Sequence, residues 1–318
     1  MSVQLQPELE LSLKGRDFIA LVDYTSEEIQ YLLDLAIELK RKQKAGEIYQ
    51  PLKGKTLGMI FEKASTRTRV SFEVGMYQLG GHPLFLSGND MQIGRGEPIW
   101  DTAQVLSRYV DGIMIRTFAH KKIIELARGA TVPVINGLTD LSHPCQALAD
   151  YLTILEKKGS LKGLKIAYIG DGNNMAHSLM MGAAKLGMHI SVATPEGYGP
   201  DFEVWQMAKE AAALSGGSVH ICHDPLEAAV NADVLYTDVW ASMGFEAEQK
   251  VREAAFKNYQ VNEKLVKLAK PDYLFMHCLP AHRGEEVSED IIDGAHSIII
   301  DQAENRLHAQ KAIMAAIL

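Results

Sequence analysis

The sequence has few cysteines and no long apolar run. Its 318 residues include only three cysteines, Cys145, Cys222 and Cys278. Their odd number and wide spacing exclude a disulfide framework and indicate a reducing compartment. No apolar run approaches the roughly 18 to 20 residues of a membrane span, and residues 1–21 lack the apolar core of a signal peptide. We therefore expect a cytoplasmic protein without a membrane partner.

Basic residues are also too few for a polyanion-binding surface. Lys and Arg number 32 against 40 Asp and Glu, a formal net charge of −8, which argues against a nucleic-acid partner or an anionic membrane. A few arginines can still form a pocket for a small anion. Hydrophobic residues make up 47% of the chain and are spread along it, so we expect a folded protein, and the length suggests two domains.

Short apolar runs alternate with longer helical patterns along the chain. Many runs are continuous rather than alternating, as in parallel strands that are buried on both faces. The predicted strands are residues 55–61, 112–116, 132–135, 165–169, 189–193, 218–222, 234–237, 273–276 and 297–300. The predicted helices are residues 27–44, 70–79, 100–109, 146–156, 177–186, 201–214 and 302–317. This alternation predicts an α/β protein with two doubly wound domains, each built on a parallel sheet.

A polar segment with Gly159 and Gly163 follows the helix at 146–156 and marks a domain boundary, because a new strand begins directly after it. We assign residues 1–150 to a first domain and residues 151–301 to a second. The C-terminal helix, about residues 302–318, is expected to pack back on the first domain.

The segment from Glu62 to Arg69 combines hydroxyl and guanidinium groups at a strand-to-helix junction. Ser65 or Thr66 is suited to cap the helix, and helix N-termini bind anions through backbone N–H groups and the helix dipole. Arg67 adds a bidentate donor for phosphate. The alternative is an ordinary capped helix with solvated arginines, since capping boxes are common.

Two further junctions carry polar residues. His143 and Gln146 flank Pro144, which can begin a helix beyond the carboxyl end of a strand, where α/β sheets bind ligands. The alternative is a lone loop histidine. Residues 170–177 look at first like a dinucleotide fingerprint, but Met175 stands where G-x-G-x-x-G needs Gly or Ala. This departure disfavours a nicotinamide cofactor.

Asp238 follows another strand and offers a carboxylate for a cationic amine, with Ser242 four residues on; a helix-capping aspartate is the alternative. Cys278 lies between His277 and His282, whose spacing fits one half of a structural zinc site, but no cysteine pair lies beside them, so no metal is expected. The sequence alone does not decide whether Cys278 forms a nucleophile pair with a histidine, because that depends on the distance between the two side chains. Because all these segments follow strands, we expect one active-site crevice between the two sheets.

Three motifs in order resemble the signature of the transcarbamylases: Ser65-Thr66-Arg67-Thr68-Arg69, His143-Pro144-Cys145-Gln146 and His277-Cys278-Leu279-Pro280. Asp238 with Ser242-Met243-Gly244 resembles the branch of this family that uses ornithine. The resemblance extends over nearly the whole chain, through Glu304-Asn305-Arg306-Leu307. It implies transfer of the carbamoyl group of carbamoyl phosphate to the δ-amine of L-ornithine, giving L-citrulline and phosphate, without a metal or an organic cofactor.

The resemblance also implies roles for single residues. Arg116, His143 and Thr68 are expected to donate hydrogen bonds to the oxyanion, and Cys278 to position the reacting groups. The residues expected to bind carbamoyl phosphate, mostly in the first domain, are Ser65, Thr66, Arg67, Thr68, Gln92, Arg116, His143, Pro144, Cys145, Gln146, Cys278, Leu279 and Arg306. Those expected to bind ornithine, in the second domain, are Asn174, with Asn173 as the alternative, Asp238, Ser242 and Met243. The family forms homotrimers, and Gln92 resembles a loop residue that reaches a neighbouring subunit's site.

Three rival functions remain at this point. A transcarbamylase for putrescine is disfavoured because putrescine has no carboxylate for Asn174 and Ser242 to hold. A non-catalytic binding subunit is disfavoured because every catalytic position of the family is filled. A dehydrogenase is disfavoured by Met175. The sequence leaves open whether the reaction serves arginine synthesis or breakdown.

Overall fold

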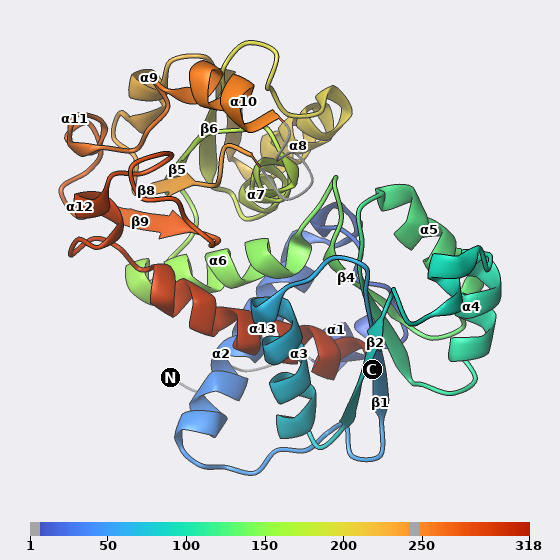
Figure 1. Cartoon of the computed structure of the whole chain (residues 1–318). Coiled ribbons are helices and arrows are strands. Elements are labelled where there is room, and N and C mark those ends of the chain that lie inside the picture. Colours follow the sequence, from blue (N-terminus) through green and yellow to red (C-terminus); the bar gives the residue numbers. More distant parts are fainter. Residues whose placement is uncertain (1–6, 242–247) are drawn as a thin grey trace. The chain divides into compact units, whose positions relative to one another are not determined.

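The computed structural model describes residues 7–241 and 248–318, and these form two compact units (Figure 1). Unit 1 contains Met1–Leu152 and Glu304–Leu318, and unit 2 contains Thr153–Ala303. Helices α6 (Pro144–Lys158) and α13 (Ile299–Ile317) each run through a boundary between the units. Both units are α/β folds on parallel sheets, so the predicted fold class is confirmed.

Unit 1 has a four-stranded parallel sheet in the order β2 (His82–Ser87), β1 (Thr56–Phe61), β3 (Gly112–Arg116) and β4 (Val134–Leu138). The chain moves outward from β1 to β2 and then returns to the other side of β1 for β3 and β4. Because parallel crossovers are right-handed, this reversal places helices on both faces of the sheet. The order reverses between β1 and β3, and ligands of open α/β sheets bind at the carboxyl ends of such strands.

The helices of unit 1 supply apolar faces to this sheet. Isoleucines of β1 and β3, with Val134 of β4, form a buried cluster with residues of α4 and α5. The helical segments described in unit 1, besides α6 and α13, are α1 (Pro7–Leu13), η1 (Leu21–Asp23), α2 (Ser26–Lys44), α3 (Thr66–Gln78), η2 (Gln92–Arg95), α4 (Ile99–Leu106) and α5 (His120–Gly129).

The C-terminal part of α13 packs against α2 and α3 in unit 1. Lys311 Nζ lies 2.9 Å from Gln43 Oε1 of α2 and 2.9 Å from Gln78 Oε1 of α3. The close approach of α3 and α13 depends on Gly75, because a Cβ at this position would lie 3.0 Å from Met314 Cε and 3.2 Å from Lys311 Cγ. This packing fixes the helix that carries Arg306.

Unit 2 has a five-stranded parallel sheet in the order β7 (Ser218–Cys222), β6 (His189–Ala193), β5 (Lys165–Ile169), β8 (Val234–Thr237) and β9 (Leu274–His277). The order reverses between β5 and β8, so this sheet is also doubly wound. The helices described here are α7 (Asn174–Lys185), α8 (Phe202–Ser215), α9 (Pro225–Ala229), α10 (Gln249–Phe256), α11 (Glu263–Val266) and α12 (Glu289–Ile292).

The strand predicted at residues 297–300 is wrong. Ser297 makes only an isolated bridge to Phe275, in which Phe275 N donates to His296 O and Ile298 N donates to Phe275 O. Helix α13 then begins at Ile299. The apolar run of three isoleucines therefore enters a helix, and a short apolar run does not by itself distinguish a strand from a buried helical turn. No helix in the described part of the chain is both long and apolar enough to span a membrane.

Candidate active site

The N-terminus of α3 lies directly after β1, at the point where the order of the unit 1 sheet reverses. Ser65 has an extended backbone, and its Oγ accepts a hydrogen bond from Thr68 N at 3.2 Å. Of the two N-caps that the sequence left open, Ser65 is thus the one used. Thr66, which is exposed, and the half-buried Arg67 occupy the first turn, where backbone N–H groups and the helix dipole favour an anion.

The buried hydroxyl of Thr68 is the meeting point of two arginine side chains. Arg116 Nη1, from the end of β3, lies 3.4 Å from Thr68 Oγ1, and Arg306 Nη2, from α13, lies 3.1 Å from it. Both guanidinium groups are almost fully buried. Both guanidinium groups donate to the hydroxyl oxygen, as does Ser65 Oγ at 3.1 Å, so the hydroxyl hydrogen of Thr68 can point at a bound oxyanion.

Gln146 of α6 joins the same group. Its Oε1 accepts from Arg306 Nη1 at 2.7 Å, and its Nε2 donates to Asp150 Oδ1 at 2.8 Å. Asp150 fixes the orientation of the amide, and the amide in turn fixes Arg306. Four segments widely separated in sequence thus meet around Thr68, and we call Ser65, Thr68, Arg116, Gln146 and Arg306 the Thr68 cluster.

His143 lies buried immediately before α6, close to this positive charge. The pKa of His143 is well below its usual value, first because the ring is buried and then because Arg306, Arg116, Lys63 and Arg67 repel a proton. The imidazole is therefore neutral at pH 7 and can donate one N–H without carrying charge. Several cations around a neutral ring create a local positive potential that suits a small anion, despite the negative net charge of the chain.

Pro144 is the first residue of α6, as the sequence predicted, and Cys145 is buried behind it. Cys145 Sγ lies 3.3 Å from Asn136 O, and burial raises the pKa of this thiol to about 12. This side chain therefore packs in the core as a protonated thiol. Gln92 lies in the exposed turn η2 and does not join the Thr68 cluster in the described residues of the chain.

Glu62 is a further polar residue at the junction of β1 and β3, and sequence reasoning gave it no role. Its backbone N donates to Arg116 O at 3.0 Å, and its carboxylate accepts from Thr117 Oγ1 and Lys122 Nζ. These contacts link the segment between β1 and Ser65 to the end of β3, which carries Arg116. Its position directly after a strand was the one available sequence signal.

In unit 2, the carboxylate of Asp238 is held where the strand order reverses between β5 and β8. Asn173 Nδ2 donates to Asp238 Oδ2 at 2.9 Å, while Val239 N at 2.8 Å and Cys278 Sγ at 3.0 Å approach Oδ1. Asn173 Oδ1 caps α7 by accepting from Met175 N at 2.9 Å. Asn173 is thus engaged in positioning Asp238.

Asn174, the ornithine-binding residue preferred from the sequence, is the first residue of α7 and is partly exposed beside Asn173. The predicted ligands Ser242 and Met243 lie outside the described residues. Cys278 donates to a carboxylate, which is consistent with the positioning role expected for it.

The segment after β9 is fixed by hydrogen bonds to the ring and backbone of His277. Leu279 N donates to His277 Nδ1 at 2.8 Å, so the ring proton lies on Nε2, which faces Glu286 Oε1 at 3.0 Å. His277 N donates to Gln302 Oε1 at 3.0 Å. Leu279 adopts a φ of 59°, which is uncommon for a non-glycine residue and indicates a constrained backbone.

Arg252 of α10 connects both flanks of the segment that contains residues 242–247. Its Nη1 lies 2.8 Å from Asp171 Oδ2 and 3.0 Å from Trp240 O, and its Nε lies 3.0 Å from Glu248 Oε2. Asp171 follows β5, and burial raises its pKa although Arg252 acts in the opposite direction. Sequence reasoning missed Arg252, Glu286 and Gln302, because they are remote in sequence from the motifs that they support.

Three sets of potential metal ligands occur among the described residues. In the first, Asp238, His277 and Cys278, the ring nitrogens and the carboxylate are engaged in the hydrogen bonds described above. The second is His282, Glu285 and Glu286, and Glu286 already accepts from His277 and from His282 N. The third, His220, Cys222 and Glu227, lies on β7 and α9, away from the strand ends that carry Asp238 and Cys278.

Comparison with known proteins agrees with the resemblance predicted from the motifs. The carbamoyl-P binding domain of aspartate/ornithine carbamoyltransferase matches residues 16–156, and its Asp/Orn binding domain matches residues 162–317. An ornithine carbamoyltransferase of Anoxybacillus flavithermus is 65% identical over 308 residues, 97% of this chain and 98% of that protein. An anabolic ornithine carbamoyltransferase of Pyrococcus furiosus is 61% identical over 308 residues, again 97% and 98%.

Solved structures give the same result. An ornithine carbamoyltransferase structure from Pyrococcus furiosus superposes with a TM-score of 0.94 at 62% identity and covers 96% of this chain and 97% of that one. An anabolic enzyme from Campylobacter jejuni superposes with a TM-score of 0.89 at 43% identity, covering 94% and 97%. From the motifs, the parallel sheets and these matches we conclude that the chain belongs to the aspartate/ornithine carbamoyltransferase family.

Proposed function

We propose that the chain transfers the carbamoyl group of carbamoyl phosphate to the δ-amine of L-ornithine, producing L-citrulline and phosphate. The observation that carries this proposal is the Thr68 cluster, in which Arg116 and Arg306 converge on one buried hydroxyl at a helix N-terminus beside the neutral His143. It lies in the part of the chain that matches a carbamoyl-P binding domain. Relatives at 61–65% identity over nearly their whole length are named ornithine carbamoyltransferases.

Unit 1 binds carbamoyl phosphate in this proposal. The phosphate group is held at the N-terminus of α3 by backbone N–H groups and by Ser65, Thr66, Arg67 and Thr68, since dipole and guanidinium both favour a dianion. The carbamoyl oxygen faces Arg116, the Thr68 hydroxyl and His143. Gln146 acts by orienting Arg306.

Unit 2 binds ornithine. The Asp238 carboxylate, held by Asn173, Val239 N and Cys278, takes the α-ammonium group, while Asn174 assists in binding the amino-acid end. Ornithine binding by unit 2 is supported by the match to an Asp/Orn binding domain. Ser242 and Met243 complete the proposed set, and turnover requires both units because each binds one of the two reactants.

The chemical step is a direct acyl transfer. The lone pair of the neutral δ-amine forms a C–N bond to the carbamoyl carbon, and the carbonyl electrons move to oxygen. When the oxyanion collapses, the C–O bond to phosphate breaks, phosphate leaves with the bonding pair, and the nitrogen loses a proton. Donors preorganised toward an oxyanion are worth about 2.7 to 4 kcal/mol each in a measured case, and Arg116, Thr68 and His143 supply this stabilisation. His143 donates as a neutral imidazole.

A substrate comparison tests the proposed function. The chain is incubated with carbamoyl phosphate and, in turn, L-ornithine, putrescine and L-aspartate, and phosphate and carbamoylated product are measured. We expect citrulline and phosphate in equal amounts with ornithine alone. Preferential carbamoylation of putrescine or aspartate would refute the assignment. Arg67→Ala should severely reduce the use of carbamoyl phosphate, and a near-normal kcat/KM in that variant would contradict the proposed phosphate site.

We further propose that the enzyme is a cytoplasmic homotrimer of arginine metabolism. The free cysteines support a reducing compartment, and the exposed turn that carries Gln92 is suited to reach a neighbouring subunit. Mixing separately inactive Gln92 and Asp238 variants should restore part of the activity in hybrid trimers. Absence of recovery would show that each subunit works alone, and a mass other than that of a trimer in light scattering would separately contradict the proposed assembly.

A further inference from the structure

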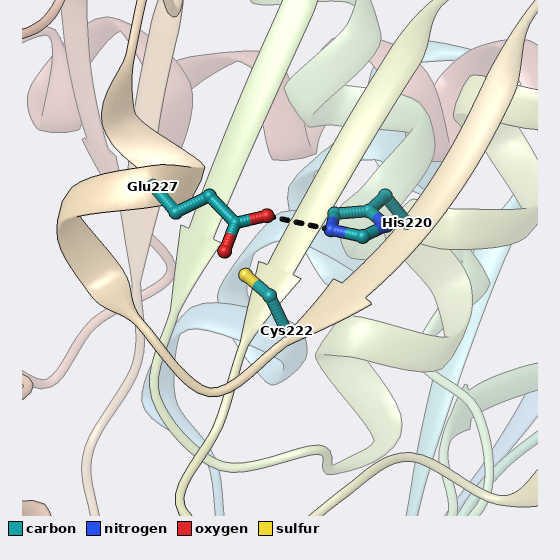
Figure 2. Close-up of side chains that lie close together, drawn as sticks. All are labelled: His220, Cys222 and Glu227. Carbon is teal, nitrogen blue, oxygen red and sulfur yellow. Dashed lines mark hydrogen bonds and ion pairs between the residues drawn. The ribbon is translucent and has the colours of Figure 1, made fainter.

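A group of side chains of the types that bind metals lies on the edge strand of the unit 2 sheet and on the helix that follows it. Strand β7 places His220 and Cys222 two residues apart, so their side chains leave the same face of the strand. Glu227 comes from the following helix, α9. Figure 2 shows the imidazole, the thiol and the carboxylate turned toward one another. None of the three takes part in the proposed carbamoyl transfer.

The spacing of the three groups suits a single small cation. His220 Nε2 and Glu227 Oε1 are 3.0 Å apart, and the ligand atoms of all three residues lie within 4.8 Å of one another. Zinc–ligand bonds of about 2.0 to 2.3 Å in a tetrahedron place neighbouring ligand atoms roughly 3.3 to 3.6 Å apart. Small rotations of the exposed His220 and Glu227 side chains are therefore enough to close the three groups around one ion.

The backbone between the ligands is held firmly. Asp224 caps α9 by accepting from Leu226 N at 2.8 Å. His223 Nδ1 lies 2.8 Å from Thr194 O, and Tyr259 OH donates to His223 O at 2.6 Å. The turn from Cys222 to Glu227 is thus fixed by the residue after β6, by the cap of α9 and by the segment after α10. These contacts hold the ligands near the binding geometry before an ion binds.

The exposure of the ligands also favours a site that solvent ions can enter. The His220 and Glu227 side chains are 57% and 58% exposed, whereas Cys222 is buried beneath them. A bound dication would replace the thiol proton and neutralise the carboxylate.

We propose that His220, Cys222 and Glu227 form a Zn²⁺-binding site with one coordination position open to water. A thiolate, an imidazole and a carboxylate are the ligands that zinc uses, whereas Mg²⁺ and Ca²⁺ require oxygen ligands. Three protein ligands plus a solvent molecule complete a tetrahedron. The ion would link the edge strand to α9.

Cadmium binding tests the site, because a cadmium–thiolate bond has an ultraviolet charge-transfer band. The parent protein is the full chain with Cys278→Ser, which removes the thiol beside Asp238, and Cys145 is fully buried. In this background we expect the band on addition of Cd²⁺, competition by Zn²⁺, and loss of the band with Cys222→Ser. Absence of the band from the parent would overturn the proposal.

Two ligand variants separate a three-residue site from a lone reactive thiol. Loss of an outer-shell partner lowers metal affinity by about 10- to 100-fold. Because His220 and Glu227 would bind the ion directly, His220→Asn and Glu227→Gln should each lower the affinity for cadmium by at least this factor. The matched control is His189→Asn on the adjacent strand β6, where His189 Nδ1 bonds Ser218 Oγ at 2.9 Å, and it should bind as the parent does. Unchanged affinity in both ligand variants would show adventitious thiol binding.

A folding control keeps this test interpretable. Each variant is also made with Cys278 intact, and its carbamoyl transfer is measured in chelator-treated buffer, where we expect the activity of the unmodified chain. In this second background, Cys222→Ser should lower the zinc stoichiometry by one ion per chain. An unchanged stoichiometry would contradict the proposal even if the Cys278→Ser parent failed to fold.

Discussion

Substitution of Thr68 by Val examines the Thr68 cluster directly. Valine has nearly the shape of threonine, so the packing of the fully buried side chain is retained while Oγ1 is lost. Arg306 Nη2 loses an acceptor at 3.1 Å and Arg116 Nη1 loses one at 3.4 Å. The variant therefore removes an oxygen on which both guanidinium groups converge.

The expected effects follow from these distances. The Arg306 contact has normal hydrogen-bond length and involves a charged donor, so its loss should cost about 1.5 to 3 kcal/mol of stability, while the longer Arg116 contact adds less. Loss of an oxyanion donor typically reduces kcat by about 10²- to 10³-fold. Because the donor acts on charge that develops during reaction, we expect kcat to fall more than KM rises.

The measurement is an initial-rate study of citrulline formation with both substrates varied, together with thermal unfolding. Thr68→Ser keeps the hydroxyl and should recover most of the rate. Ser71→Ala is the matched control on the same helix, because Ser71 Oγ donates within α3, to Arg67 O at 2.6 Å and Thr68 O at 3.2 Å. The reasoning is refuted if Thr68→Val retains kcat, or if Ser71→Ala loses it to the same extent.

Three further predictions concern Asn173, Arg252 and His143. Asn173→Ala removes a hydrogen bond to the Asp238 carboxylate and should raise the KM for ornithine by about 10-fold or more; a rise in the KM for carbamoyl phosphate instead would contradict this role. Arg252→Gln leaves the carboxylate of Asp171 largely buried without its guanidinium partner and should lower the free energy of unfolding in urea by about 3 to 5 kcal/mol, with a smaller loss when Asp171→Asn is added. Because the pKa of His143 is depressed in the folded chain, only the unfolded state gains its proton as pH falls through about 6.5. Stability is thus retained above that pH and lost below it, and His143→Asn should flatten the decline in Tm between about pH 7 and 5.

Much of the fold could be predicted because most strands are buried on both faces. Five of the predicted strands, at residues 112–116, 165–169, 189–193, 218–222 and 234–237, have the observed bounds. Strand β2 was missed because it lies at the sheet edge with partly exposed side chains, contains Pro83 and has an apolar run of only three residues, Leu84 to Leu86. Edge strands have weak periodicity, and short apolar runs such as 297–300 fit either state.

The candidate site could be predicted where its residues follow strands. Ser65, His143 and Asp238 were chosen as candidates because strand ends of parallel sheets are where polar residues meet ligands. Arg306 entered only through the family resemblance, since no local pattern in α13 indicates that its side chain reaches Thr68, 238 residues away in sequence. His220, Cys222 and Glu227 were overlooked because their spacing matches no paired zinc motif.

The concentration of positive charge around neutral His143 has a consequence for how the enzyme is inhibited. The charges of Arg306, Arg116, Lys63 and Arg67 all disfavour a proton on this ring. The same positive potential attracts any small dianion. The phosphate that leaves during turnover has the charge and shape of the group that first entered. It should therefore compete with carbamoyl phosphate, so that rates measured in phosphate or sulfate buffers fall below those in buffers of bulky monovalent anions.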